Sequence, residues 1–161
     1  MTSLTPRLRR IADFVRLGVS VLDIGADHAF LCCYIAEKGD NSRVIAVDAK
    51  PEPLKHGQYA AKGLPIEFYL SDGFTGLPTE VVSDIAANAY DIVVAGLGGE
   101  TIIDILRHAP VNTDTRFILQ PMSKTDKLRD GLAELGYNIT EECTIQDGKR
   151  AFAVFVAEPP R

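Results

Sequence analysis

Short apolar runs alternate with amphipathic stretches along most of this chain. The runs are rich in β-branched residues, end at glycine or polar residues, and predict buried strands. These strands cover residues 19–24, 43–48, 66–70, 91–95 and 116–120. Apolar positions at helical spacing, with glycines at several helix ends, predict the helices that alternate with them. These helices cover residues 5–17, 27–38, 52–62, 100–108 and 123–135.

The end of the chain departs from this alternation. Two strand-like runs, residues 139–145 and 151–157, flank a segment whose Asp-Gly pair is a hairpin signal. The whole pattern predicts an α/β fold with a doubly wound, mostly parallel seven-stranded sheet that ends in an antiparallel hairpin. A hairpin beside the fifth strand is typical of the Rossmann-like class I methyltransferase fold. We expect one domain, residues 1–161, with ligands at the carboxyl ends of the central strands.

Composition narrows the class of protein. With 46% hydrophobic and 24% charged residues and no apolar run long enough to cross a bilayer, we expect a soluble protein away from membranes. The first seven residues lack a secretory signal pattern, which predicts a cytoplasmic location and reduced cysteines. Cys32 and Cys33 are adjacent on a predicted helix and point apart, so no metal site is expected. No obligate protein partner is indicated, and a net charge of -5 leaves nucleic-acid binding to local basic patches.

The turn after the first strand carries the first candidate chemistry. Gly25-Ala26-Asp27-His28 does not match the dinucleotide fingerprint G-x-G-x-x-G, which disfavours a pyrophosphate. Asp23 and Asp27 suit an ammonium group, Gly25 permits close approach of the backbone, and loop amides suit a carboxylate. S-adenosylmethionine has both groups at its aminoacyl end and has no phosphate. The turn therefore predicts this cofactor, with His28 as either a binding or a packing residue.

Two further acids follow the next two strands. Asp48 lies 23 positions after Gly25, close to the spacing at which such folds place an acid on ribose hydroxyls. Asp72, beside Gly73, follows the third strand, where it suits the adenine amino group with Phe74 or Leu70 packed on the ring. Any one of these acids could instead cap a helix or bind backbone amides. Three together favour cofactor binding.

A glycine-rich loop follows the fourth strand. Gly96, Gly98 and Gly99 predict a backbone that substrate or cofactor approaches closely, although a tight helix-entry turn is the alternative. The Asp/Asn-Pro-Pro-aromatic motif of enzymes that methylate exocyclic amines is absent here. Methylation of an exocyclic amine by that machinery is therefore disfavoured.

The chain resembles the catalytic domain of the bacterial tRNA (adenine(22)-N(1))-methyltransferases. The resemblance rests on four segments: Leu4-Thr5-Pro6-Arg7-Leu8, Asp23-Ile24-Gly25-Ala26-Asp27-His28-Ala29-Phe30-Leu31, Ala95-Gly96-Leu97-Gly98-Gly99 and Ile118-Leu119-Gln120-Pro121. It implies methyl transfer from S-adenosylmethionine to N1 of an adenine in tRNA. The chain departs from the family pattern where Ala26, Phe30 and Cys32 replace serine, tyrosine and proline. Family members also usually continue into a C-terminal helical extension, whereas this chain stops at Arg161.

Within that resemblance we expect particular roles for several residues. The loop from Gly96 to Gly99 would line the target pocket, with Gly98 and Gly99 at the catalytic centre, and Asp27 would orient the methionine end of the cofactor. Gln120 would bind the base edge or the cofactor, unless it only satisfies backbone groups beside Pro121. The basic side chains that would contact tRNA phosphates, unless they only form solvated helix faces, are Arg7, Arg10, Lys124 and Lys127.

Three other classes of protein compete with this interpretation. A methyltransferase of a small molecule would keep the cofactor acids but would not depend on tRNA. A binding module without catalysis would hold S-adenosylmethionine and transfer nothing. A dinucleotide oxidoreductase is disfavoured by the missing fingerprint.

Overall fold

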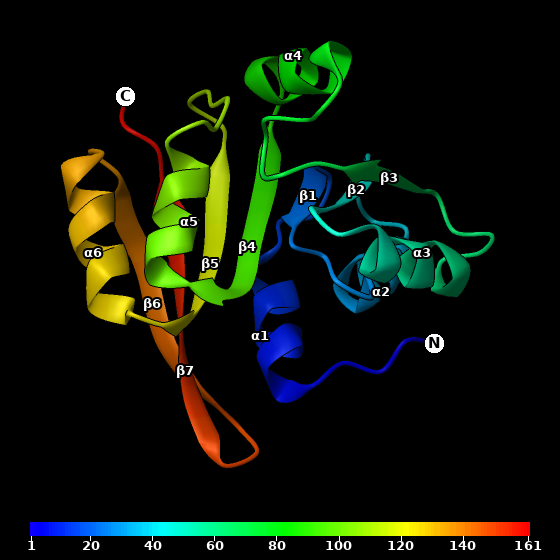
Figure 1. The fold of residues 1–161 in the computed structure, drawn as a ribbon, viewed down its shortest axis with the longest axis horizontal. Helices are drawn as coiled ribbons and strands as arrows, with labels where there is room; N and C mark the ends of the chain where they lie inside the picture. The colour runs from blue at the N-terminus through cyan, green and yellow to red at the C-terminus, as the bar shows by residue number, and fades with distance from the viewer.

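A twisted seven-stranded sheet forms the centre of the structure, a computed structural model that describes residues 1–161 (Figure 1). The strands are β1 (Ser20–Ile24), β2 (Val44–Asp48), β3 (Ile66–Leu70), β4 (Tyr90–Gly98), β5 (Arg116–Ser123), β6 (Asn138–Asp147) and β7 (Arg150–Glu158). The helices are α1 (Pro6–Phe14), α2 (Phe30–Lys38), α3 (Pro51–Ala60), α4 (Thr79–Ala87), α5 (Gly99–Leu106) and α6 (Thr125–Glu134).

The strand order is β3-β2-β1-β4-β5-β7-β6. The pairs from β3 to β5 are parallel, whereas β7 pairs antiparallel with both β5 and β6. The predicted sheet, including the hairpin beside β5, is therefore confirmed. The chain moves outward from β1 to β3 and then returns to β4 on the other side of β1. This reversal leaves a crevice at the carboxyl ends of β1 and β4, where α/β sheets bind their ligands.

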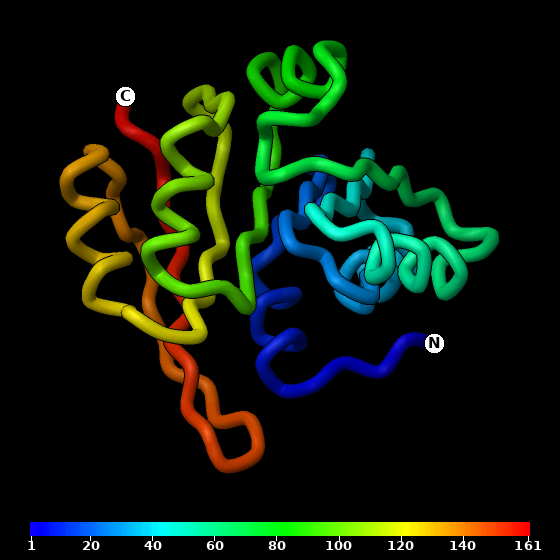
Figure 2. The backbone as a smooth tube through the Cα atoms, viewed as in Figure 1, coloured from blue at the N-terminus to red at the C-terminus, as the bar shows by residue number.

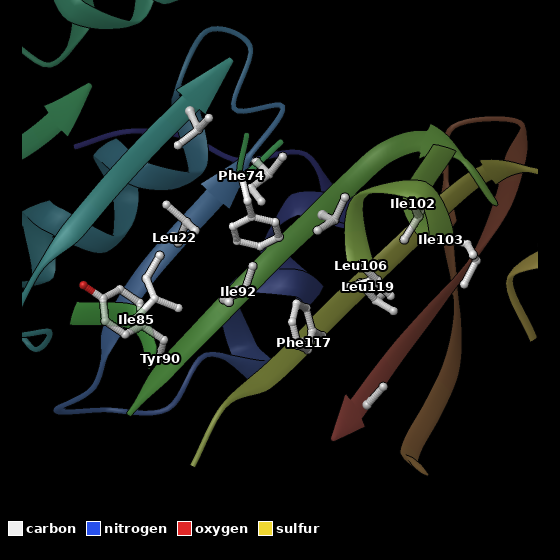
Figure 3. Packing of buried hydrophobic residues seen from close by; sticks show 14 of the residues in the cluster. Leu22, Phe74, Ile85, Tyr90, Ile92, Ile102, Ile103, Leu106, Phe117 and Leu119 are labelled. Atoms are coloured by element: carbon white, nitrogen blue, oxygen red, sulfur yellow. The ribbon is translucent and has the colours of Figure 1, made fainter. Parts of the chain in front are cut away.

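Helices cover both faces of the sheet and separate the core into two clusters. Alternate residues of each central strand point to opposite faces, so Leu22 and Ile92 join the larger cluster whereas Val21 and Val93 join the smaller one. Figure 3 shows the larger cluster, to which Ile102 and Leu106 of α5 and Leu119 of β5 belong. The parallel strands are continuous apolar runs because both faces of the sheet are buried. No helix is long and apolar enough to cross a membrane.

Several element boundaries differ from the sequence prediction, among them those of α2, α1 and β4. Helix α2 begins at Phe30 and not at Asp27, because Asp27 and Ala29 have φ values of 52° and 59°, which a right-handed helix excludes. Helix α1 ends at Phe14, after which Val15 is extended. Strand β4 continues through the glycine loop to Gly98, pairing irregularly with β5.

Helix α4 is not among the helices predicted from the sequence. Only Val81 and Ile85 of this helix are fully buried, and its N-cap is Pro78, which provides no capping side chain. With two core positions and no cap, the segment lacks the usual signals of a helix start and an apolar stripe.

The β6–β7 hairpin extends past the ends of β4 and β5 on the side where α5 begins (Figures 1 and 2). Helix α1 packs against β6 near this end. Asp147 at the hairpin end accepts a hydrogen bond from the Arg7 backbone N–H at 3.2 Å. The N-terminal helix is thereby fixed beside the carboxyl edge of the sheet.

Candidate functional site

A cavity of about 480 Å³ opens at the carboxyl ends of the central strands. Its volume falls within the range of small-molecule and cofactor sites. The wall includes the backbone and side chains of the turn after β1, together with residues that follow β2, β3 and β4. All of the predicted cofactor residues line it, namely Asp23, Gly25, Ala26, Asp27, His28, Asp48, Asp72, Gly73 and Gly96. The fold thus brings these residues together at one site, as the sequence predicts.

Asp23 is the most buried acid in this wall. Its side chain lies at the end of β1 and the residue is 5% exposed. The pKa of Asp23 is raised from 3.8 to about 7, chiefly by burial and also by the nearby Asp48 carboxylate, while the hydrogen bond from Cys32 and the charge of Arg7 lower it. The Cys32 thiol is 3.8 Å from Asp23 Oδ2 and is its single side-chain partner. A cationic ligand group would therefore complete an otherwise weakly partnered carboxylate.

Asp48 joins two loops at the edge of the cavity. Its Oδ2 accepts from the Asp27 N–H and its Oδ1 accepts from the Lys50 N–H, each at 2.9 Å. These bonds fix the turn after β1 against the turn after β2. Asp48 therefore binds backbone amides, which is one of the alternatives that the sequence left open for these acids. Asp48 also lines the cavity.

The turn after β3 presents Asp72 to solvent and to the cavity. Ser71 orders this turn, because its hydroxyl donates to the Gly73 carbonyl and accepts from the Gly76 N–H, each at 2.8 Å. The positions of Phe74 and Leu70 do not support the expectation that either of them packs on an adenine ring. Phe74 belongs to the core, and neither side chain lines the cavity.

The glycine loop divides into two parts with different roles. Gly96, with φ of 78°, lines the cavity together with Leu97. Gly98 and Gly99 do not line it, and their place at the catalytic centre stays a prediction. A Cβ atom on Gly99 would lie 2.2 Å from the Lys124 carbonyl oxygen. Gly99 is therefore required for packing of α5 against the β5–α6 connection.

Gln120 lies behind the cavity wall, near the end of β5. It is 0% exposed and does not line the cavity. Its Nε2 donates to the Pro121 carbonyl at 2.8 Å, and its Oε1 accepts from Arg7 Nη1 at 2.6 Å and from the Gly96 N–H at 3.2 Å. These bonds agree with the alternative in which Gln120 satisfies groups beside Pro121, and they connect Gln120 to Arg7 and Gly96, which line the cavity.

The basic residues predicted to contact RNA occupy different environments. Arg7 lines the cavity itself. Arg10 stacks over the Phe14 ring at 4.6 Å, and Lys124 lies 3.4 Å from Glu100 on the surface. Lys127 is exposed in the first turn of α6. Arg7 therefore faces the cavity, while Arg10, Lys124 and Lys127 remain candidates for contact with tRNA phosphates.

Three aromatic side chains gather at the cavity mouth, a cluster that the sequence did not reveal. His28 stacks on His56 of α3 with ring centroids 5.2 Å apart and planes at 8°. Phe30 lies 5.7 Å from the His28 ring, and both line the cavity. His28 is thus a packing residue that also lines the cavity, and its role in binding the cofactor stays a prediction.

The sheet order and the acid-lined cavity define a Rossmann-like protein that binds a small molecule at the topological switch point. The chain belongs to the family described as methyltransferase domain, which it matches over residues 4–155. The terminal hairpin and the acids after β1, β2 and β3 agree with this membership.

Curated relatives and solved structures extend the comparison. The chain is 31% identical over 159 residues to the tRNA (adenine(22)-N(1))-methyltransferase of Bacillus subtilis, covering 96% of this chain and 65% of the relative. The crystal structure of the Bacillus subtilis M1A22 tRNA methyltransferase TrmK superposes with a TM-score of 0.87 at 26% identity, covering 99% of this chain and 68% of that one. A Streptococcus pneumoniae protein solved with S-adenosyl-L-methionine has a TM-score of 0.83 at 29% identity, covering 99% and 74%. The chain spans 61 to 65% of the length of the curated relatives that it matches.

Proposed function

We propose that this chain is the catalytic domain of an S-adenosylmethionine-dependent methyltransferase that modifies N1 of an adenine in tRNA. The observation that carries the proposal is the convergence of Asp23, Asp48 and Asp72 on one cavity at the switch point of the sheet. The similarity to the Bacillus subtilis enzyme supports the substrate. A tRNA substrate also favours a cytoplasmic location.

The residues present fit the proposed cofactor. The buried Asp23 carboxylate lacks a cationic partner within the usual distance of an ion pair and suits the ammonium at the methionine end. Asp48 suits the ribose hydroxyls and Asp72 the adenine amino group. Gly25 and Gly73, with φ of 74° and 60°, carry the two turns in a conformation that side chains disfavour. The apolar part of the wall includes Pro53, Leu97 and Ile105.

The cofactor supplies an electrophilic methyl group on a sulfonium. A methyl–N1 bond would form on adenine as the methyl–sulfur bond breaks, and the positive charge would pass from sulfur to the base. The N1 lone pair needs no proton removed, so the task of this chain's residues is positioning. Asp27 and Asp48 fix the cofactor turn through their 2.9 Å hydrogen bond. Gly96 and Leu97 line the cavity beside the turn after β1.

Labelled S-adenosylmethionine and unmodified tRNA test the proposal directly. We expect label in RNA and a reverse-transcription stop at one adenine. Asp72→Ala should reduce cofactor affinity roughly tenfold, because its carboxylate has no protein hydrogen-bond partner to lose and would contact only the ligand. Asp104→Ala is the matched control, since Asp104 is an exposed acid of α5 outside the cavity.

Two other outcomes would contradict parts of the proposal. Cofactor binding without RNA labelling, in this chain and in a longer form that restores the length of the relatives, would identify a binding module or a small-molecule methyltransferase. Equal cofactor affinity of the Asp72→Ala and Asp104→Ala variants would remove the assignment of Asp72.

A further inference from the structure

Tyr59 of α3 is the most exposed tyrosine or phenylalanine of this chain, with 84% of its surface open to solvent. Its ring takes part in no aromatic or cation–π contact within the protein, and its hydroxyl forms no hydrogen bond. A single exposed ring is common at protein surfaces, so the residues around it decide what it can bind.

Two lysines flank this ring on the same side of the helix. Lys55 lies one turn before Tyr59 and Lys62 lies one turn after it, and both are exposed. Lys62 forms no ion pair, and Lys55 has only Glu52 at 3.8 Å, a surface pair that contributes little. We call Lys55, Tyr59 and Lys62 the Lys-Tyr-Lys stripe.

The stripe extends from the cavity along one side of the molecule. Pro53, in the first turn of α3, lines the cavity, and the His56 ring stacks on His28 at the cavity mouth. Tyr59 follows Pro53 by six residues, which is about 9 Å along a helix axis. Helix α3 packs on β2 and β3, whereas α6, with Lys124 and Lys127, lies on the other side of the sheet centre (Figure 1). The stripe is therefore separate from the basic residues predicted to contact tRNA.

Charge complementarity indicates the occupant. Residues 50–62 contain three lysines and one glutamate, in a chain whose net charge is -5. Alternating basic and aromatic side chains suit RNA, because lysines bind phosphates and an exposed ring stacks on an unpaired base. An adenine that is methylated on N1 must leave its pair and its stack, so bases beside it lose a stacking partner.

We propose that the Lys-Tyr-Lys stripe is an RNA-contact surface, in which Tyr59 stacks on an unpaired base of the tRNA and Lys55 and Lys62 bind phosphates beside that base. The inference rests on the proposed tRNA substrate.

Two other kinds of partner suit this surface less well. Lysine is depleted in interfaces between proteins, and here two lysines flank one ring. A helix that lies on a membrane needs a broad apolar face, whereas the exposed residues of α3 include Glu52, Lys55, His56 and Gln58.

Fluorescence anisotropy with an unmodified tRNA transcript tests the role of the ring. Tyr59→Ala should weaken binding by at least about fivefold, as for loss of one stacked base, and should leave the salt dependence unchanged because no charge is removed. Tyr59→Phe should retain most of the affinity. Leu17→Ala is the matched control, since Leu17 is 75% exposed and precedes β1 at the amino edge of the sheet. Thermal unfolding should be similar in all three variants, because neither side chain is buried.

Charge variants test the lysines and the acid beside them. Lys55→Gln and Lys62→Gln should each weaken binding and reduce the slope of log affinity against log salt by about 0.7, as for one contact to a single strand. Glu52→Gln should strengthen binding at low salt, a gain that misfolding cannot produce. Arg107→Gln is the control, because Arg107 is an exposed base of the α5 end in an i,i+3 pair with Asp104, as Lys55 is with Glu52.

Several results would overturn the inference. If the unmodified chain binds tRNA and every stripe variant binds it equally well, the stripe has no role and the proposed substrate still stands. If the unmodified chain binds no tRNA even at low salt, the proposed substrate is refuted and the inference falls with it. If Tyr59→Ala instead abolishes binding to anionic phospholipid vesicles, or converts a dimer to a monomer in sedimentation, without a change in tRNA affinity, the occupant is a membrane or a second copy of the chain.

Discussion

Asp23 has an electrostatic environment that neither its neighbours in the sequence nor its residue type reveals. A carboxylate at the end of a central strand is buried by β2, β4 and α2, and this burial raises its pKa to about 7. Because the folded protein holds this proton where an unfolded chain with a pKa near 3.8 has lost it, the contribution of Asp23 to the free energy of unfolding decreases as pH rises from about 4 to about 7.

This pKa predicts that cofactor affinity depends on pH. The ammonium of the ligand pairs with the ionised form of Asp23, so the affinity for S-adenosylhomocysteine should increase as pH rises from about 5.5 to about 7, by up to roughly tenfold per pH unit. Calorimetry across this interval measures the slope. Asp23→Asn should bind more weakly and show a flat profile, and an unchanged slope in this variant would assign the titration to another group.

At the scale of elements, the adjacent glycines Gly98 and Gly99 at the β4–α5 junction differ in how closely other atoms approach them. A Cβ atom on Gly98 would meet only the Ser123 hydroxyl at 3.4 Å, whereas one on Gly99 would overlap the Lys124 backbone carbonyl. A backbone atom cannot move aside as a flexible side chain can. The tight approach of α5 to the β5–α6 connection therefore depends on Gly99.

We expect Gly99→Ala to reduce the free energy of unfolding by at least about 2 kcal/mol, as for overpacking of a buried contact. Gly98→Ala should cost no more than about 1 kcal/mol, because Gly98 has φ of −67° and alanine is only a poorer N-cap. Urea unfolding of the two variants measures the difference. Similar losses in both would show that the connection yields and that Gly99 is not a packing constraint.

At the scale of the whole molecule, tRNA binding must overcome a net charge of -5. Lys124 and Lys127 begin α6 at the carboxyl edge of the sheet, and Arg10 lies on α1, which packs beside that edge. We propose that these three residues contribute to a phosphate-binding surface at the carboxyl edge of the sheet. Arg107 ends α5 at the opposite edge and provides a control.

We expect Arg10→Ala, Lys124→Ala and Lys127→Ala each to weaken tRNA binding and to reduce the dependence of the logarithm of affinity on the logarithm of salt concentration by about one unit or slightly less. Fluorescence anisotropy at several salt concentrations measures both quantities. Arg107→Ala should change neither. If all four variants retain the affinity and salt dependence of the unmodified chain, the phosphate-binding surface lies elsewhere.

The sequence by itself determined the strand–helix alternation, the terminal hairpin and the acids that line the cavity. Each of these depends on local information: the period of apolar residues, the turn signals and the position of an acid directly after a strand. Parallel strands bring their carboxyl ends to one edge, so Asp23, Asp48 and Asp72 had to converge once the alternation was recognised. Helix α4 was not predicted, because its two core positions and its Pro78 cap give a weak local signal.

Only the tertiary structure decided which charged and polar side chains face the cavity. Arg7 and Gln120 are 113 positions apart and become hydrogen-bonded partners only when α1 packs beside the end of β5. Gly98 and Gly99 look alike in sequence, and the Lys124 carbonyl alone distinguishes them. Burial, pKa and close contact are properties of packed neighbours from distant segments, which local periodicity does not encode.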